Sequence, residues 1–179
     1  MSKLEEARSL AYEAGFTNVG DLDVDSIKVY TEVRDACAEN KCHQYGKNWA
    51  CPPGCGTLDE CSERMHKYKK GLILQTTATL EDSLDIEGMT ELGENHGKHS
   101  KEFGKKIKEI APSSMMVGAG GCIQCETCTY PDSPCRFPDQ TTSSMEALGM
   151  LVSEVCKDNN IPYYYGPGTL TFVSCVLLE

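Results

Sequence analysis

Residues 2–15 carry apolar side chains three or four positions apart, a spacing typical of one face of an amphipathic helix. The apolar positions are Leu4, Ala7, Ala11 and Ala14. Ser2 and Glu5 have the spacing of a capping box, which satisfies the free amide groups at a helix start. The pattern therefore predicts a first helix that ends at Gly15.

The rest of the chain mixes helical periods with short runs that favour strands. We expect strands at 16–24, 71–80 and 115–117, and helices at 27–36, 57–68, 85–110 and 144–156. Two of these helices have capping boxes at their starts, Thr57 with Glu60 and Ser143 with Glu146. The C-terminal segment predicts two strands around a Gly-Pro-Gly turn. Imperfect alternation of helices and strands indicates a single mixed α/β, sandwich-like domain over residues 1–179.

Composition and charge narrow the class of protein. The 179 residues are 40% hydrophobic and carry a net charge of −10, which argues against a nucleic-acid surface. No apolar run is long enough to cross a membrane, and the start of the chain lacks the pattern of an export signal. We therefore expect a cytoplasmic protein without a membrane partner. Eleven cysteines in a reducing compartment favour metal binding over disulfides.

Four of these cysteines lie in the segment 120–138. Cys122, Cys125 and Cys128 are each separated by two residues, and Cys135 follows. This run is typical of loops that turn three thiolates toward one iron–sulfur cubane while a fourth arrives from further along. Zinc, which usually takes two separated pairs, and purely structural thiols are the alternatives. The preceding GAGG stretch offers amide groups that can donate hydrogen bonds to cluster sulfurs.

Five more cysteines lie in the segment 37–61: Cys37, Cys42, Cys51, Cys55 and Cys61. Cys61 falls in the first turn of an expected helix, where the helix dipole favours a thiolate. Cys55 stands behind two prolines that fix the direction of the backbone. We expect Cys61 to be the fourth ligand of this set, with Cys37, Cys42 and Cys51, and Cys55 to be a free thiol; the reverse assignment stays open.

Both cysteine motifs together resemble a cysteine-rich family of predicted metal-binding proteins of unknown function. The first motif is C-x4-C-x2-YG-x2-W-x-CPP-x2-G, from Cys37 to Gly56, and the second combines C-x2-C-x2-C with CR-x-P and SMEA-x-G. The match spans residues 37 to about 150. The resemblance implies a cytoplasmic metal or iron–sulfur protein of a kind common in anaerobes, and it supplies no reaction.

Other residues could have a functional role, but each also has a structural explanation. His96 and His99 have a spacing that can chelate a metal, although packed histidines are more common. Cys156 and Cys175 fall on apolar faces and are expected in the core. Arg136, beside Cys135, is either a donor to the cluster or a surface residue.

Three functions fit the sequence. The first is a protein with two 4Fe–4S clusters that transfers electrons at low potential to a redox partner protein. The second is an enzyme that uses one cluster with an open iron site as a reductant or Lewis acid on a small molecule. The third is a binding module stabilised by zinc.

Overall fold

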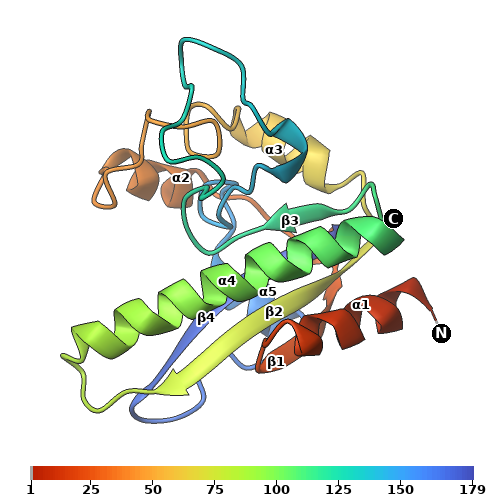
Figure 1. The fold of residues 1–179 in the computed structure, drawn as a ribbon, viewed down its shortest axis with the longest axis vertical. Coiled ribbons are helices and arrows are strands. Elements are labelled where there is room, and N and C mark those ends of the chain that lie inside the picture. Colours follow the sequence, from red (N-terminus) through yellow and green to blue (C-terminus); the bar gives the residue numbers. More distant parts are fainter. Residues whose placement is uncertain (1) are drawn as a thin grey trace.

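The structure is a computed structural model that describes residues 2–179, and it contains five α-helices and a four-stranded antiparallel sheet (Figure 1). The helices are α1 (Lys3–Glu13), α2 (Thr31–Ala38), α3 (Leu58–Met65), α4 (Ile86–Ile110) and α5 (Val152–Asp158). The strands are β1 (Asn18–Asp23), β2 (Lys70–Thr79), β3 (Met115–Val117) and β4 (Thr169–Leu178), and the 3-10 helices are η1 (Val24–Ser26) and η2 (Pro138–Gln140). The predicted mixed α/β class is confirmed.

The last strand lies inside the sheet rather than at its edge. The strand order is β1-β2-β4-β3, so β4 pairs with β2 along ten residues and with β3 along three. The expected C-terminal hairpin is therefore wrong: residues 162–165 form no strand, and the partners of β4 come from far earlier in the chain. The last six residues of β4 are all buried. Burial is possible there because strands on both sides pair with the backbone of β4.

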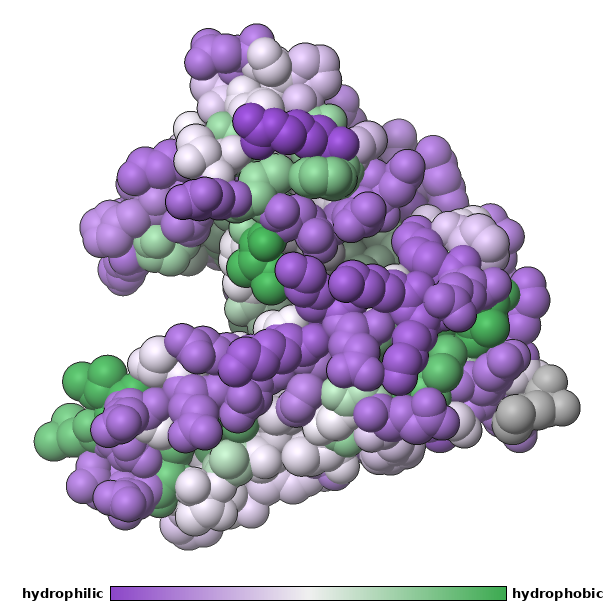
Figure 2. Space-filling model, in the orientation of Figure 1, coloured by the Kyte–Doolittle hydropathy of each residue, from purple (hydrophilic) through white to green (hydrophobic). Residues whose placement is uncertain are grey.

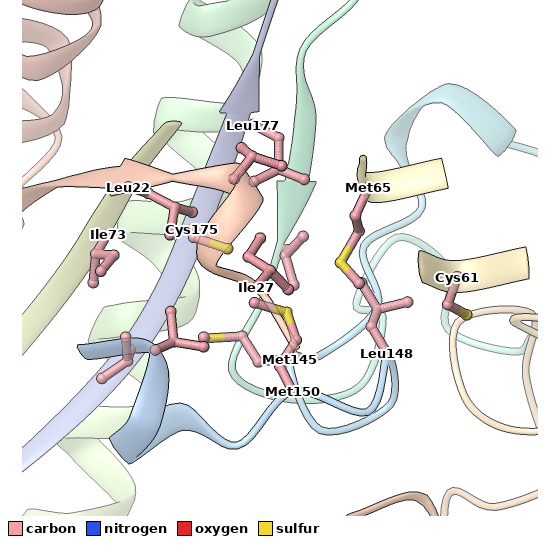
Figure 3. Packing of buried hydrophobic residues seen from close by; sticks show 14 of the residues in the cluster. Leu22, Ile27, Cys61, Met65, Ile73, Met145, Leu148, Met150, Cys175 and Leu177 are labelled. Carbon is pink, nitrogen blue, oxygen red and sulfur yellow. The ribbon is translucent and has the colours of Figure 1, made fainter. Parts of the chain in front are cut away.

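Each face of the sheet covers its own hydrophobic cluster. On one face, α1 and α4 pack over Leu72, Leu74 and Val176 of the sheet. On the other face, Ile73, Cys175 and Leu177 contact a larger cluster formed by η1, α3, α5 and the segment 145–150 (Figure 3). Alternate residues of β2 and β4 serve opposite faces, as the two-residue period of a strand requires.

Helix α4 runs along the sheet for 25 residues, in spite of the four glycines in its sequence. Leu92, Phe103 and Ile107 form its buried stripe, and both Phe103 and Ile107 are 0% exposed. Full burial of such a side chain contributes roughly 2 kcal/mol, which offsets the low helix propensity of the glycines. Asp85 caps the helix by accepting a hydrogen bond from the Gly88 amide at 2.8 Å.

Two predicted helices begin later than the sequence indicates. The helix expected at 27–36 is α2, which begins at Thr31, because residues 27–30 are extended and the Tyr30 amide donates to the Gly149 carbonyl at 2.8 Å. The helix expected at 144–156 is only α5, from Val152. Residues 144–150 form turns instead, and Gly149 has a φ of +84°, which no helix contains.

The two cysteine segments and α2 and α3 form a lobe above one end of the sheet, on the far side of β3 from α4 (Figure 1). Across residues 2–179, no helix combines the length and the apolar character that crossing a membrane demands.

Candidate metal centre

The first cysteine segment is a series of turns shaped by asparagine and glycine. Asn40, His43 and Gly46 have positive φ angles, and the Asn40 side chain accepts a hydrogen bond from the Tyr45 amide at 3.0 Å. Asn48 is buried, and its side-chain oxygen accepts from the amides of Ala50 and Cys51 at 3.0 and 2.9 Å. These local bonds give the backbone around Cys51 a defined path where no regular structure is present.

The second cysteine segment starts at the end of β3. The Gly118 amide donates to the Ser143 carbonyl at 2.8 Å, and the Met145 amide donates to the Gly118 carbonyl at 3.0 Å. These bonds close the base of the loop that contains all four cysteines. Within the loop, the Arg136 guanidinium donates to the Thr127 carbonyl at 2.8 Å. Arg136 therefore has a structural role in the loop.

The two segments pack directly against each other. The rings of Trp49 and Tyr130 meet edge to face with centroids 4.9 Å apart, and the Trp49 indole donates to the Ser133 carbonyl at 3.1 Å. Nearby, a side chain at Gly121 would touch the Gln44 side chain, with its Cβ 3.6 Å from Gln44 Cγ. The chain thus brings residues about eighty positions apart into one surface.

Thiols of both segments lie around Cys51. Burial is the main cause that raises the pKa of Cys51, a hydrogen bond with Asn48 opposes it, and the thiols of Cys42, Cys122 and Cys128 raise it further. Two of these neighbours come from the second segment. Cys51 is therefore the point at which the two cysteine sets meet.

Cys37, at the end of α2, belongs to the same neighbourhood. Burial raises the pKa of its thiol most, and Glu146, Cys42 and Cys51 add to the increase, while the Arg34 guanidinium lowers it. Burial and neighbouring thiols therefore disfavour the thiolate at Cys37 and Cys51, and a bound cation would favour it.

Cys55 and Cys61 form a separate pair. Both are buried, at 6% and 0% exposure. Their mutual hydrogen bond raises the pKa of Cys55 and lowers that of Cys61. The guanidinium groups of Arg34 and Arg64 lie 3.4 and 3.5 Å from the Cys61 sulfur and also lower its pKa, so Cys61 is the more acidic thiol of the pair. Figure 3 shows Cys61 on α3 at the edge of the core.

The remaining expected ligands are half-buried in the second segment. Cys135 lies 3.0 Å from the Thr141 hydroxyl, and Cys125 lies between Cys122 and Cys128 along the loop. Within residues 2–179, no three His, Cys, Asp or Glu side chains already converge on a point where one metal ion could bind. The thiols are neighbours, and a metal would have to draw them together.

The donor chemistry nevertheless fits a thiophilic metal. Soft thiolates select zinc, copper(I) or iron–sulfur clusters over magnesium or calcium. Among the groups that act on Cys37 and Cys51, Glu146 is the one carboxylate. The cysteines of each segment are the residues that would hold the metal, which would supply redox or Lewis-acid chemistry there. Binding would release protons from thiols whose pKa is raised.

His96, His99 and the last two cysteines belong to other parts of the chain than these loops. His96 is a buried residue of α4, and its Nδ1 is 2.8 Å from the Thr76 hydroxyl. His99 lies next to the same hydroxyl, at 3.3 Å. Cys156 and Cys175 are both 0% exposed, which confirms their predicted place in the core.

The fold and the two cysteine segments define a class, a mixed α/β protein with a cysteine-rich lobe. The family model described as "Predicted metal-binding protein (DUF2284)" matches residues 20–178, and the chain belongs to this family. The resemblance seen in the cysteine motifs is thereby confirmed. No curated protein and no solved structure matches the chain.

Proposed function

We propose that this metal-binding protein carries two 4Fe–4S clusters and transfers electrons at low potential. The proposed ligands are Cys37, Cys42, Cys51 and Cys61 for one cluster, and Cys122, Cys125, Cys128 and Cys135 for the other. The observation that supports this most is the gathering of thiols from both segments around Cys51. Two clusters held by adjoining loops would be close enough to exchange electrons with each other.

The position of Cys61 bears on the first ligand set. Arg34 contacts the Cys61 sulfur and also lowers the pKa of Cys37, so this one guanidinium acts on both thiols. Cys61 is already polarised toward a thiolate, the form that binds iron. A guanidinium that donates to a ligand sulfur stabilises the reduced, more negative cluster and raises its potential.

Iron and acid-labile sulfide counts on anaerobically purified protein test the proposal. We expect about eight irons and about eight sulfides per chain. Cys51→Ser should lose iron, whereas Cys156→Ala, in the core, should keep it. A count near four would leave one set without a cluster. Zinc without sulfide would replace the proposal with a zinc-stabilised module.

A second candidate is an enzyme that uses one cluster on a small molecule. The observation that favours it is a groove of about 1010 Å³ lined by Cys55 and Cys122, because a carrier needs no such space. A change in the EPR signal of one cluster on addition of a small molecule would select this function over electron transfer.

A further inference from the structure

A large groove separates α4 from the lobe that holds the cysteines. One wall is the face of α4 with Gly93, Gly97 and Gly104, and the other is formed by the segments 118–124 and 138–143. Figure 2 shows the surface hollowed between the lobe and α4. A Cβ added at Gly97 would have no neighbour within 4 Å, so the absence of side chains on this face opens the groove.

Two buried polar atoms in the lining have no hydrogen-bond partner in the described part of the protein. They are Nε2 of His96 and the hydroxyl of Ser114, and both residues are 2% exposed. An unsatisfied buried polar group costs roughly the strength of a hydrogen bond, so native proteins retain few of them. Their presence along one groove indicates a polar ligand.

The charged side chains that line the groove are mostly positive. Arg64, Lys101, Lys105 and Lys108 line it, and Asp139 is the one acidic residue among the described residues of the lining. Lys101 and Lys105 take part in no salt bridge found in residues 2–179. This is a concentration of positive charge on a chain whose net charge is −10. A cleft lined by one sign of charge attracts the opposite sign.

The spacing of the cations suits a ligand with two anionic groups. Lys101 and Lys105 are one helical turn apart, about 6 Å along the axis, on the same side of α4. Lys108, a further turn along, is held at the end of the groove by the carbonyls of Pro112 and Ser114. The apolar part of a ligand can contact Met116 and Phe172, which also line the space.

We infer that this groove binds a small organic molecule with two anionic groups, carboxylates or phosphates, that contact Lys101 and Lys105. The inference does not depend on which metal the cysteines hold. It adds a binding site beside them, since Cys55 and Cys122 line the same groove.

Calorimetric titration of the metal-loaded protein at low salt tests the site. The probes are succinate, with two carboxylates, and fructose 1,6-bisphosphate, with two phosphates; the tighter probe assigns the anionic group. The double variant Lys101→Gln/Lys105→Gln should bind that probe about tenfold more weakly or worse, since two charged contacts are lost. The control Lys98→Gln/Lys106→Gln removes the same charge from the same helix outside the groove. Because these two lysines do not line the groove, the affinity of the control for the probe should stay within about twofold.

A steric variant provides an independent test. Gly97→Leu should abolish binding because the new side chain projects into the groove. Leucine has a higher helix propensity than glycine, so the variant should stay folded. A thermal melt of the variant checks this. The inference is overturned if neither probe binds, if both double variants weaken binding equally, or if Gly97→Leu binds like the unmodified protein.

Discussion

At the scale of single residues, burial alone does not decide the chemistry of a cysteine. Cys55 and Cys175 are both buried, and the pKa of each thiol is raised. Cys61 is equally buried, yet a hydrogen bond from Cys55 and two guanidinium groups lower its pKa. Identical thiols thus differ in pKa because of the partners that α3 and α2 place beside them.

This difference predicts the outcome of two substitutions. Cys61→Ser should remove one cluster, about half of the iron, because a hydroxyl is a poor ligand for iron compared with a thiolate. Cys55→Ser should keep nearly all the iron. Iron content and EPR of each variant measure the effect. The assignment is reversed if Cys55→Ser loses a cluster and Cys61→Ser retains both.

The burial of His96 predicts a dependence of stability on pH. Burial lowers its pKa from 6.5 to about 4, so the unfolded chain binds a proton that the folded protein resists. The contribution to stability is complete above pH 6.5 and is lost as the pH falls toward 4. The loss amounts to about 3 kcal/mol. In urea unfolding, the stability of His96→Phe should change by about 3 kcal/mol less over this pH range than that of the unmodified protein.

At the scale of elements, the glycines of α4 differ in what surrounds them. The backbone at Gly97 faces the open groove, whereas a Cβ at Gly88 would collide with the carboxylate of the N-cap residue Asp85. Glycine at position 88 therefore protects the cap, and glycine at position 97 preserves space. Only Gly97 lowers the stability of the helix without a structural benefit to it.

Alanine substitutions should separate these two roles. Gly97→Ala should increase the free energy of unfolding by about 1 kcal/mol, the difference in helix propensity. Gly88→Ala should decrease it, because the clash with Asp85 outweighs the same propensity gain. Denaturant unfolding of both variants provides the measurement. An equal gain in both would mean that the cap adjusts without cost.

Local signals in the sequence predicted elements well where the deciding contacts are also local. The capping box of Thr57 and Glu60 forms as expected at the start of α3. The same residue types at Ser143 and Glu146 start no helix, because Ser143 pairs with Gly118 and Gly149 packs against Val29 from distant parts of the chain. No pattern in residues 143–156 carries that information.

At the scale of the whole molecule, the meeting of the two cysteine segments depends on the complete fold. Their spacings suggested two separate sites, and nothing in either motif indicates that Cys51 lies near Cys122 and Cys128. The contact arises because β3 leads into the second segment on the side where α2 and α3 hold the first. The candidate thiol donors are thus readable from the sequence, whereas their arrangement in space is not.

Metal removal should therefore act on both segments together. Residues 37–61 and 120–138 have turns and few buried apolar side chains, so the metal would supply much of their order. Chelation should increase hydrogen exchange in both segments while the amides of β2 and β4 stay protected. Equal exchange in the segments with and without metal would show that the protein alone maintains their shape.

The contact between Trp49 and Tyr130 gives the protein an optical reporter of its own. Trp49 is the single tryptophan of the chain, and it lies where the two segments touch. All tryptophan emission therefore originates at this junction, and its wavelength and intensity follow the water and the quenching groups around that one ring. Loading and loss of the metal can be followed by intrinsic fluorescence, without any label.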